Sequence, residues 1–268
     1  MTVADRLYQL PMSLVGVAIG VALLPRLSQS LQKDDHDDAQ AAMDQGVVFA
    51  LALSLPAAAA LMALPVWLID GFFTRGEFRT ADAAATGRLL FHYAWGVPAF
   101  VLLRILQPAF FARQDTRTPM RFSLISVAVN IALGVGLFAW IGFQGVAIAT
   151  SVAAWVTVLQ MWLTLTRRDV WRPSARAAGK IARVIVASAA LGAILFAAAL
   201  FRAQIEGAIA AVLPGGHGAK EIAILLVSAA GLALYPLLLF ASGGITPDEA
   251  RAALRRRKGD PGPSADLL

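Results

Sequence analysis

Long stretches without charge, separated by short polar connections, dominate the pattern of this chain. Residues 122–166 contain no Asp, Glu, Lys or Arg. A helix needs about 20 apolar residues to cross a hydrocarbon core of ~30 Å, so this stretch is long enough to cross twice. Gly142 and Gly145 predict the tight turn between the two crossings. The apolar stretches are continuous, whereas a transmembrane barrel would alternate polar and apolar residues, so we expect helices.

The same pattern along the whole chain predicts seven transmembrane helices and therefore an all-α polytopic membrane protein. The predicted spans are residues 3–30, 45–69, 83–112, 122–141, 145–166, 181–201 and 221–241. We expect residues 1–170 to form one lobe of five helices and residues 171–242 to add two helices. The polar residues 243–268 predict a tail outside the membrane.

Basic residues give these spans an orientation. Lys and Arg are concentrated in the segments that follow the first, third, fifth and seventh predicted spans. Short loops rich in Lys and Arg lie in the cytoplasm, so the C-terminus is predicted to be cytoplasmic and Met1 to lie on the opposite side. A first span that starts outside needs a preceding span, so we expect a segment upstream of this sequence.

Composition narrows the class of protein further. Hydrophobic residues make up 58% of the 268 residues, against roughly 45–50% in a soluble domain. There is no cysteine, which excludes disulfides and thiolate metal sites. The net charge of +6 lies in the connections, so we attribute it to topology and not to nucleic-acid binding. No HExxH, GxSxG or Walker sequence is present, so we expect no enzyme and no cofactor or metal site, and the acidic residues 34–38 and His217 are interpreted as loop residues.

Polar groups within the spans are the candidates for function, because charge inside a membrane is costly. Asp5 and Arg6 lie at the outer end of the first span, and Arg104 lies midway along the third. Each could serve transport, or could reach the interface and anchor its helix there. Asn130 and Thr150 lie in the fourth and fifth spans, where such residues bind a cation or, more often, hydrogen-bond a neighbouring helix.

Two further features of the spans are interpreted structurally. Arg88 and His92 lie one turn apart near the outer end of the third span, where they predict interfacial anchors. Prolines within the spans predict bent helices, because proline frees a backbone carbonyl; they include Pro56, Pro65, Pro98, Pro108 and Pro236. Such bends suit transporters but occur in polytopic proteins generally.

Two segments carry a resemblance to a known family. Residues 4–11 read ADRLYQLP and residues 113–119 read RQDTRTP, with GEF at 76–78 between them. In this order they resemble the MurJ/MviN lipid II flippases, which belong to the multidrug/oligosaccharidyl-lipid/polysaccharide exporter superfamily. The resemblance covers residues 3–170, and the last two spans fit that family's two extra C-terminal helices.

The resemblance implies that the seven spans are helices 8–14 of a fourteen-helix exporter fold. Family members move the lipid-linked peptidoglycan precursor, lipid II, from the cytoplasmic to the periplasmic leaflet of the bacterial inner membrane by alternating access. Helices 1–7 would come from a missing N-terminal lobe or a companion chain, so this chain is expected to be inactive alone. The alternatives are a flippase for another lipid-linked oligosaccharide, such as O-antigen or capsule units, and a non-transporting membrane scaffold.

The resemblance also implies roles for individual residues. Asp5 and Arg6 match an acidic–basic pair that lines the central cavity, where a guanidinium would attract the substrate diphosphate. Gln9 and Gly134 stand where a carboxylate is found in, or expected from, other members. The implied substrate and transport residues are Asp5, Arg6, Gln9 and Arg104, the implied conformational loop holds Arg113, Gln114, Asp115, Thr118 and Pro119, and the implied cation site holds Asn130 and Thr150.

Overall fold

The computed structural model describes residues 9, 36–73, 80–213 and 218–243, and every regular element in that part of the chain is an α-helix. Six segments are long and apolar enough to cross a membrane: Asp37–Ala63, Asp82–Phe111, Arg117–Ile141, Phe143–Arg167, Ala175–Leu200 and Ala219–Ala241. They correspond to predicted spans two to seven, which confirms the all-α polytopic class. The first predicted span, residues 3–30, lies outside the described residues except for Gln9.

The described helices follow one another with short connections. In chain order they are α3 (His36–Ala63), α4 (Pro65–Phe73), α5 (Thr80–Ala94), α6 (Val97–Phe111), α7 (Arg117–Ile141), α8 (Phe143–Arg167), α9 (Ala175–Leu200), α10 (Arg202–Val212) and α11 (Ala219–Ala241).

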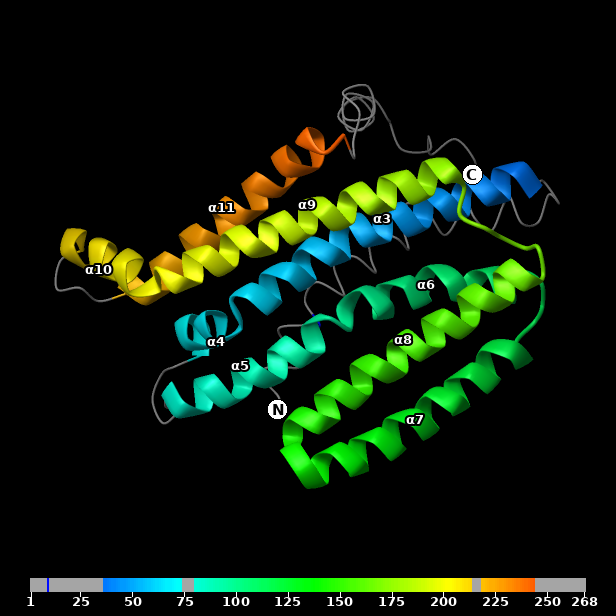
Figure 1. The fold of residues 1–268 in the computed structure, drawn as a ribbon, viewed down its shortest axis with the longest axis horizontal. Coiled ribbons are helices and arrows are strands. Elements are labelled where there is room, and N and C mark those ends of the chain that lie inside the picture. The colour runs from blue at the N-terminus through cyan, green and yellow to red at the C-terminus, as the bar shows by residue number, and fades with distance from the viewer. Residues whose placement is uncertain (1–8, 10–35, 74–79, 214–217, 244–268) are drawn as a thin grey trace, which may run out of the picture.

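The long helices pack as a row. Across the molecule the order is α11, α9, α3, α6, α8 and α7, with each helix packed against the next (Figure 1). At one end of the long helices lie α4, α10 and the beginnings of α5 and α11, and we call this the α10 end. The opposite end holds the beginning of α3, the α6–α7 loop and the linker between α8 and α9, and we call it the linker end.

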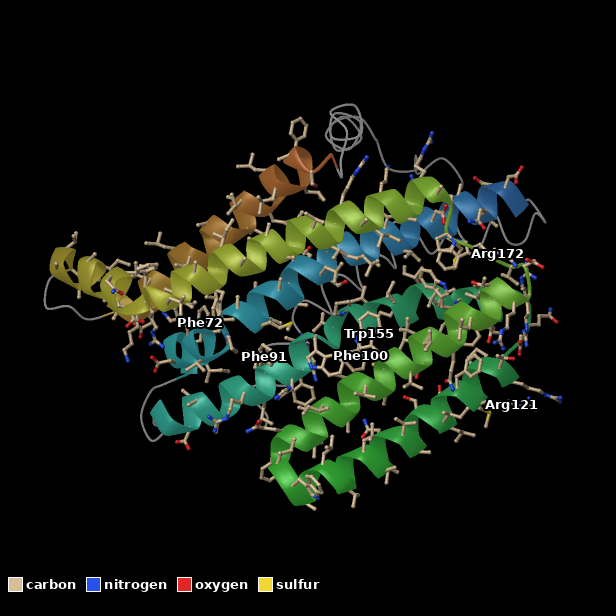
Figure 2. The ribbon with its side chains drawn as sticks, viewed as in Figure 1. Phe72, Phe91, Phe100, Arg121, Trp155 and Arg172 are labelled. Carbon is tan, nitrogen blue, oxygen red and sulfur yellow. The ribbon has the colours of Figure 1, made fainter. Side chains whose placement is uncertain are left out.

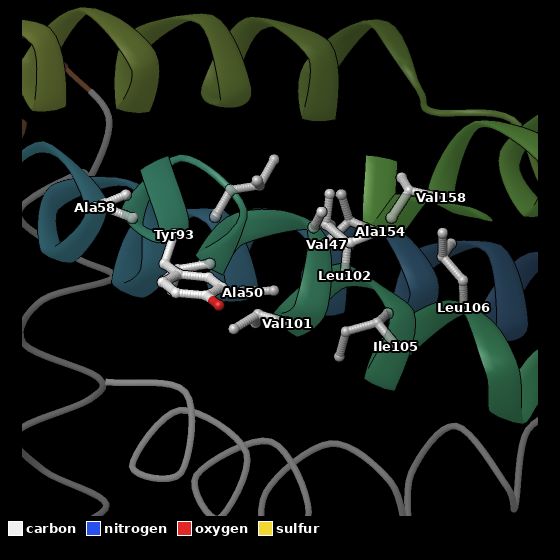
Figure 3. Close-up of a cluster of buried hydrophobic side chains, with 14 of the residues drawn as sticks. Val47, Ala50, Ala58, Tyr93, Val101, Leu102, Ile105, Leu106, Ala154 and Val158 are labelled. Carbon is white, nitrogen blue, oxygen red and sulfur yellow. The ribbon is translucent and has the colours of Figure 1, made fainter. Parts of the chain in front are cut away.

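The core lies where α3, α6 and α8 meet (Figure 3). Val47 of α3 and Leu106 of α6 are fully buried, and Leu102, Ala154 and Val158 are at most 4% exposed. Many of the other buried residues are alanines. Small residues let membrane helices approach closely, and dispersion contacts then hold the helices together where lipid removes the hydrophobic drive.

Helix α7 shows the opposite pattern. Of its 25 residues only Pro119 is buried. Ile131 is 60% exposed, Val135 69% and Trp140 89%. An exposed surface of this kind is stable when lipid is the solvent, which accounts for the excess of hydrophobic residues in the chain.

The second predicted span differs from the structure at both ends. α3 begins at His36, well before residue 45, and ends at Ala63. Asp37 and Asp38 lie in its first turn, where the partial positive charge of a helix N-terminus favours carboxylates. Pro65 has no N–H to continue the ladder, and the short helix α4 starts there. The hydropathy pattern identifies the apolar part of α3, whereas the helix itself begins in the polar segment before that part.

The third predicted span is two helices. α5 ends at Ala94 and α6 begins at Val97, with Trp95 and Gly96 in the turn between them. Pro98 stands in the first turn of α6, where its missing N–H costs nothing to α6 but prevents one unbroken helix. α10 is a further difference, because the sequence pattern treats residues 202–212 as part of a connection.

The turn between α7 and α8 is as tight as predicted. Gly142 has a φ of 63°, in the left-handed region that favours glycine. A Cβ atom on Gly145 would lie 2.6 Å from the backbone of Leu137. The absence of that atom lets the two helices meet closely beside the turn.

Candidate functional site

The predicted substrate residues lie only partly within the described chain. Asp5 and Arg6 are outside it, and Gln9 is described only as a single exposed helical residue. Arg104 lies midway along α6 with its side chain exposed, whereas the adjacent Ile105 is buried in the core. A guanidinium on the open face of a membrane helix can bind an anion that approaches from that side.

The α6–α7 loop is held in place by its own polar groups. Gln114 adopts a left-handed conformation with a φ of 58°, and the amide of Asp115 donates to the carbonyl of Phe110 over 3.0 Å. The Asp115 carboxylate accepts from the amide of Thr118 at 3.0 Å and from its hydroxyl at 2.7 Å. It thereby satisfies a free N–H in the first turn of α7, where Pro119 is buried.

Arg168, at the end of α8, reaches this loop from a distant part of the chain. Its Nη1 donates to Asp115 Oδ2 at 2.6 Å, and its Nη2 donates to the Thr118 hydroxyl at 3.2 Å. Hydrogen bonds from Thr118 and then from Arg168 lower the pKa of Asp115 to about 2. The carboxylate therefore stays ionised near neutral pH. Asp115, Thr118 and Arg168 thus hold the loop together. Arg113, the first residue of the predicted conformational loop, is exposed.

The linker between α8 and α9 is fastened to the start of α3. Trp171 is 1% exposed, and its indole N–H donates to Asp44 Oδ1 at 2.9 Å. The other oxygen of Asp44 accepts from the amide of Ser174 at 3.3 Å. The side-chain amide of Gln40 bonds to both backbone groups of Arg172, which is labelled at this end of the molecule in Figure 2.

The break between α5 and α6 is closed by side chains from α8. The hydroxyl of Ser151 donates to the carbonyl of His92 at 2.7 Å. The indole N–H of Trp155 donates to the carbonyl of Trp95 at 3.0 Å, and Figure 2 labels Trp155 beside the break. A Cβ atom on Gly96 would lie 2.5 Å from the Ser151 oxygen. The carbonyls of His92 and Trp95 at the break are therefore satisfied within the protein, as lipid requires.

The predicted cation residues lie between α7 and α8. The side-chain amide of Asn130 donates to the Thr150 hydroxyl at 3.3 Å, and that hydroxyl donates to the carbonyl of Val146 at 2.9 Å. A Cβ atom on Gly134 would be in ordinary contact with Ala149 at 3.7 Å. In the part of the chain that the structure describes, no group of three His, Cys, Asp or Glu is placed to hold a metal ion.

Comparison with known proteins gives this arrangement a family. Residues 1–213 match the family model described as lipid II flippase MurJ. The chain belongs to the MurJ family. The resemblance carried by residues 4–11 and 113–119 is thereby confirmed for this multi-pass membrane protein.

Individual MurJ relatives show the extent of the match. The chain is 37% identical over 265 residues to "Probable lipid II flippase MurJ" of Rhizobium tropici. The aligned residues cover 98% of this chain and 48% of that protein. The protein of the same description from Rhizobium meliloti (strain 1021) is 36% identical over 253 residues, with 94% and 46% covered. "Lipid II flippase MurJ" of Burkholderia cenocepacia is 32% identical over 171 residues, with 64% and 33% covered. This chain thus spans about half the length of the two Rhizobium MurJ relatives.

Several of the residues that organise these sites were not singled out as such in the sequence. Arg168 looked like one basic residue of a cytoplasmic connection, although it closes the loop of the RQDTRTP segment. Trp171 is a large aromatic residue in a polar linker, and that contrast could have predicted that it is buried against another helix, as its contact with Asp44 shows. Ser151 and Trp155 stand four residues apart, which puts them on one helical face, and that spacing could have marked them as partners of the break.

Proposed function

We propose that this chain supplies one lobe and two additional helices of a lipid II flippase in the bacterial inner membrane. Such a flippase would move the lipid-linked peptidoglycan precursor from the cytoplasmic to the periplasmic leaflet during cell-wall synthesis. The observation that carries the proposal is the match of residues 1–213 to the MurJ family model. A flippase for O-antigen or capsule units and a non-transporting scaffold are not favoured, because neither has a comparable observation behind it.

Within this proposal the basic residues recognise the substrate. Lipid II contains a diphosphate, and a guanidinium offers paired donors to phosphate oxygens. We assign this role to Arg6, with Asp5 and Gln9 tuning the site, and to Arg104. The exposure of Arg104 on the open face of α6 supports the assignment. Asn130 and Thr150 link α7 to α8, and a coupling cation at that place would need further oxygen ligands.

Transport by alternating access requires a second lobe that rocks against the first. We therefore propose that the chain works with an N-terminal lobe equivalent to helices 1–7, either joined to it or supplied separately. Its length, about half that of the Rhizobium relatives, supports this view. The charge distribution supports a cytoplasmic linker end and C-terminus, because exposed Arg113, Arg117, Arg121 and Arg167 all lie at the linker end.

A depletion experiment tests the proposal. The resident flippase of a Gram-negative host would be depleted while the host expresses this chain alone, or this chain with the remaining part of the Rhizobium tropici relative. Lipid II that reaches the outer face would be measured by its cleavage by an externally added lipid II hydrolase. We expect cleavage only when both parts are present. Cleavage with this chain alone would overturn the need for a second lobe, and its absence from both strains would overturn the function.

The same assay tests the role of Arg104. Arg104→Ala should reduce lipid II cleavage strongly, and Arg104→Lys should reduce it less, because a lysine keeps the charge but loses the paired donors. Arg88→Ala is the matched control, since Arg88 is also exposed and lies on the neighbouring helix α5. Equal effects of Arg88→Ala and Arg104→Ala at equal protein levels would contradict a specific role for Arg104.

A further inference from the structure

Helix α10 joins two long helices at the α10 end of the molecule (Figure 1). It comprises 11 residues, Arg202–Val212. At 1.5 Å per residue its length is about 16 Å, roughly half of what a hydrocarbon core requires, so it cannot cross a membrane. Its outer surface must therefore contact water, lipid or another protein.

The charged residues of α10 are turned toward the protein. Arg202 pairs with Glu206 one turn later at 2.7 Å and with Asp70 of α4, whose side chain is 1% exposed. The guanidinium of Arg202 also lies 5.7 Å from the ring centre of Trp67. Lys220, at the start of α11, approaches Asp70 at 3.4 Å. The positive charges of Arg202 and Lys220 are thus balanced by the carboxylates of Asp70 and Glu206 on the side of α10 that faces the protein.

The isoleucines of α10 lie on the same inner face. Ile205 and Ile209 pack against the cluster of buried residues that includes Trp67, Leu195 and Ile224. Together with Arg202 and Glu206 they follow the spacing i, i+3, i+4, i+7, which defines one side of a helix. The inner face of α10 therefore holds both of its charges as well as its two largest apolar residues.

The outer face has almost no polar group. Its exposed residues are Ala203, Gln204, Gly207, Ala208, Ala211 and Val212, of which only Gln204 has a polar side chain. Val212 is 84% exposed, and Leu200 and Phe201, directly before the helix, are 68% and 59% exposed. A surface helix in water would show its charges outward, so the polarity of α10 is reversed.

The two long helices that flank α10 in the chain also expose large apolar side chains. Phe196 of α9 is 56% exposed, and Leu225 and Leu226 of α11 are 54% and 57% exposed. Both helices are membrane-spanning by length and composition, so these side chains face lipid. We propose that α10 is an interfacial helix whose outer face, with Leu200 and Phe201, lies against the lipid of the leaflet at the α10 end.

The arrangement explains why the charges of α10 are paired inward. An unpaired Arg or Glu close to the hydrocarbon would be costly. Here Arg202 binds two carboxylates and an aromatic face, so the helix can enter the interface without exposing a charge. This position of α10 at the membrane boundary does not depend on the identity of the transported lipid.

Because the chain contains no cysteine, single cysteines can report on this surface. Nitroxide labels at Gln204→Cys, Ala208→Cys and Val212→Cys would be compared in lipid nanodiscs, where both membrane faces are open to solution. Collisions with oxygen measure exposure to lipid, and collisions with a nickel chelate measure exposure to water. Ile131→Cys, 60% exposed on the membrane-spanning helix α7, is the lipid control. Arg176→Cys, exposed in the first turn of α9 at the linker end, is the water control.

We expect the three labels on α10 to collide readily with oxygen, as at Ile131, and rarely with the nickel chelate. Nickel collisions as frequent as those at Arg176 would show that α10 lies in water and would overturn the proposal. Low collision rates with both reagents would show a protein covering the face and would also overturn it. Unlabelled variants must elute like the parent protein, and the three positions guard against one label that disturbs folding.

Discussion

A single carboxylate, that of Asp115, connects three segments of the chain at the linker end. It accepts from an amide in the first turn of α7 and binds Arg168 directly after α8, while the backbone N–H of Asp115 closes the turn after α6. Exposed ion pairs contribute little on their own. Here the carboxylate also accepts two hydrogen bonds from Thr118, so the loop conformation depends on its charge.

The acidity of Asp115 gives a testable pH dependence. Its folded pKa of about 2 lies below the ordinary 3.8, so its contribution to stability is present above about pH 4 and is lost as the pH falls toward about 2. Asp115→Asn should therefore lower the melting temperature in detergent near neutral pH. The difference from the parent protein should shrink below about pH 4.

A matched control separates this effect from general loss of charge. Asp169→Asn removes the 2.9 Å pair with Arg172, in which the Asp169 side chain is 78% exposed. We expect that change to leave the melting temperature nearly unaltered. A difference between parent and Asp115→Asn that does not vary with pH would contradict the role given to the Asp115 charge.

At this scale the sequence marks Asp115, Thr118 and Pro119 but does not reveal their partner. The segment RQDTRTP is a local signal, and an Asp three residues before a Thr amide is a typical helix start. Arg168 lies 53 positions further along the chain, and a single sequence holds no information that pairs it with Asp115 and not with another acidic residue. Contacts of this kind depend on how α7 and α8 fold back on each other.

Among the helices, the break between α5 and α6 is the element with the most specific construction. Gly96 lies directly against Ser151, and Ser151 supports the carbonyl of His92. The break therefore requires a glycine in α5–α6 and a small hydroxyl residue in α8. The Ser151 side chain occupies the space that a side chain at position 96 would need.

Gly96→Ala should destabilise the protein. Its Cβ atom would meet Ser151 Oγ at 2.5 Å and Ser151 Cβ at 2.9 Å, so α8 would have to move away. Overpacking of this kind costs about 1–3 kcal/mol, and we expect a lower melting temperature in detergent. Gly136→Ala in α7 is the control, because nothing lies within 4 Å of its Cβ position. A Gly96→Ala protein as stable as the control would refute the close contact.

The hydropathy pattern and the prolines predict some of the helix boundaries and miss others. Pro65 and Pro98 were predicted to bend their spans, and the structure instead has a separate helix beginning at or near each, since a proline cannot continue a helical ladder. The start of α3 and the existence of α10 were not predicted, because hydropathy responds to lipid and both segments contain charged residues. The charges of α10 are compensated by Asp70 and Trp67, which belong to a different part of the chain.

On the scale of the whole molecule, α9 and α11 are fixed to α3 and α4 at three levels. The linker end has the Trp171–Asp44 contact, and the middle has a hydrogen bond from the Tyr235 hydroxyl to the carbonyl of Ala52 at 2.7 Å. The α10 end has the ion pair of Arg202 with Asp70. These contacts are spread along the length of the long helices, so we expect the two added helices to move with α3 as one body.

Loss of the first contact should release the linker. Asp44→Ala leaves the buried indole N–H of Trp171 without its acceptor, at a cost of about 1–3 kcal/mol. Trypsin should then cut more rapidly after Arg168, which cleavage-site mapping by mass spectrometry would show. Asp37→Ala, in the exposed first turn of α3, is the control. Equal cleavage rates for parent and Asp44→Ala would mean that the contact does not hold the linker.

The charge-free turn at Gly142 has a consequence for how the chain is made. Neither α7 nor α8 has a charged residue near the turn, whereas Arg117 and Arg121 lie at the beginning of α7, and Arg167 and Arg168 lie at the end of α8. Both sets of arginines hold their ends of the helices on the same side of the membrane. The turn itself has no charge that would hold it back from crossing, and we expect α7 and α8 to enter the bilayer together as a hairpin.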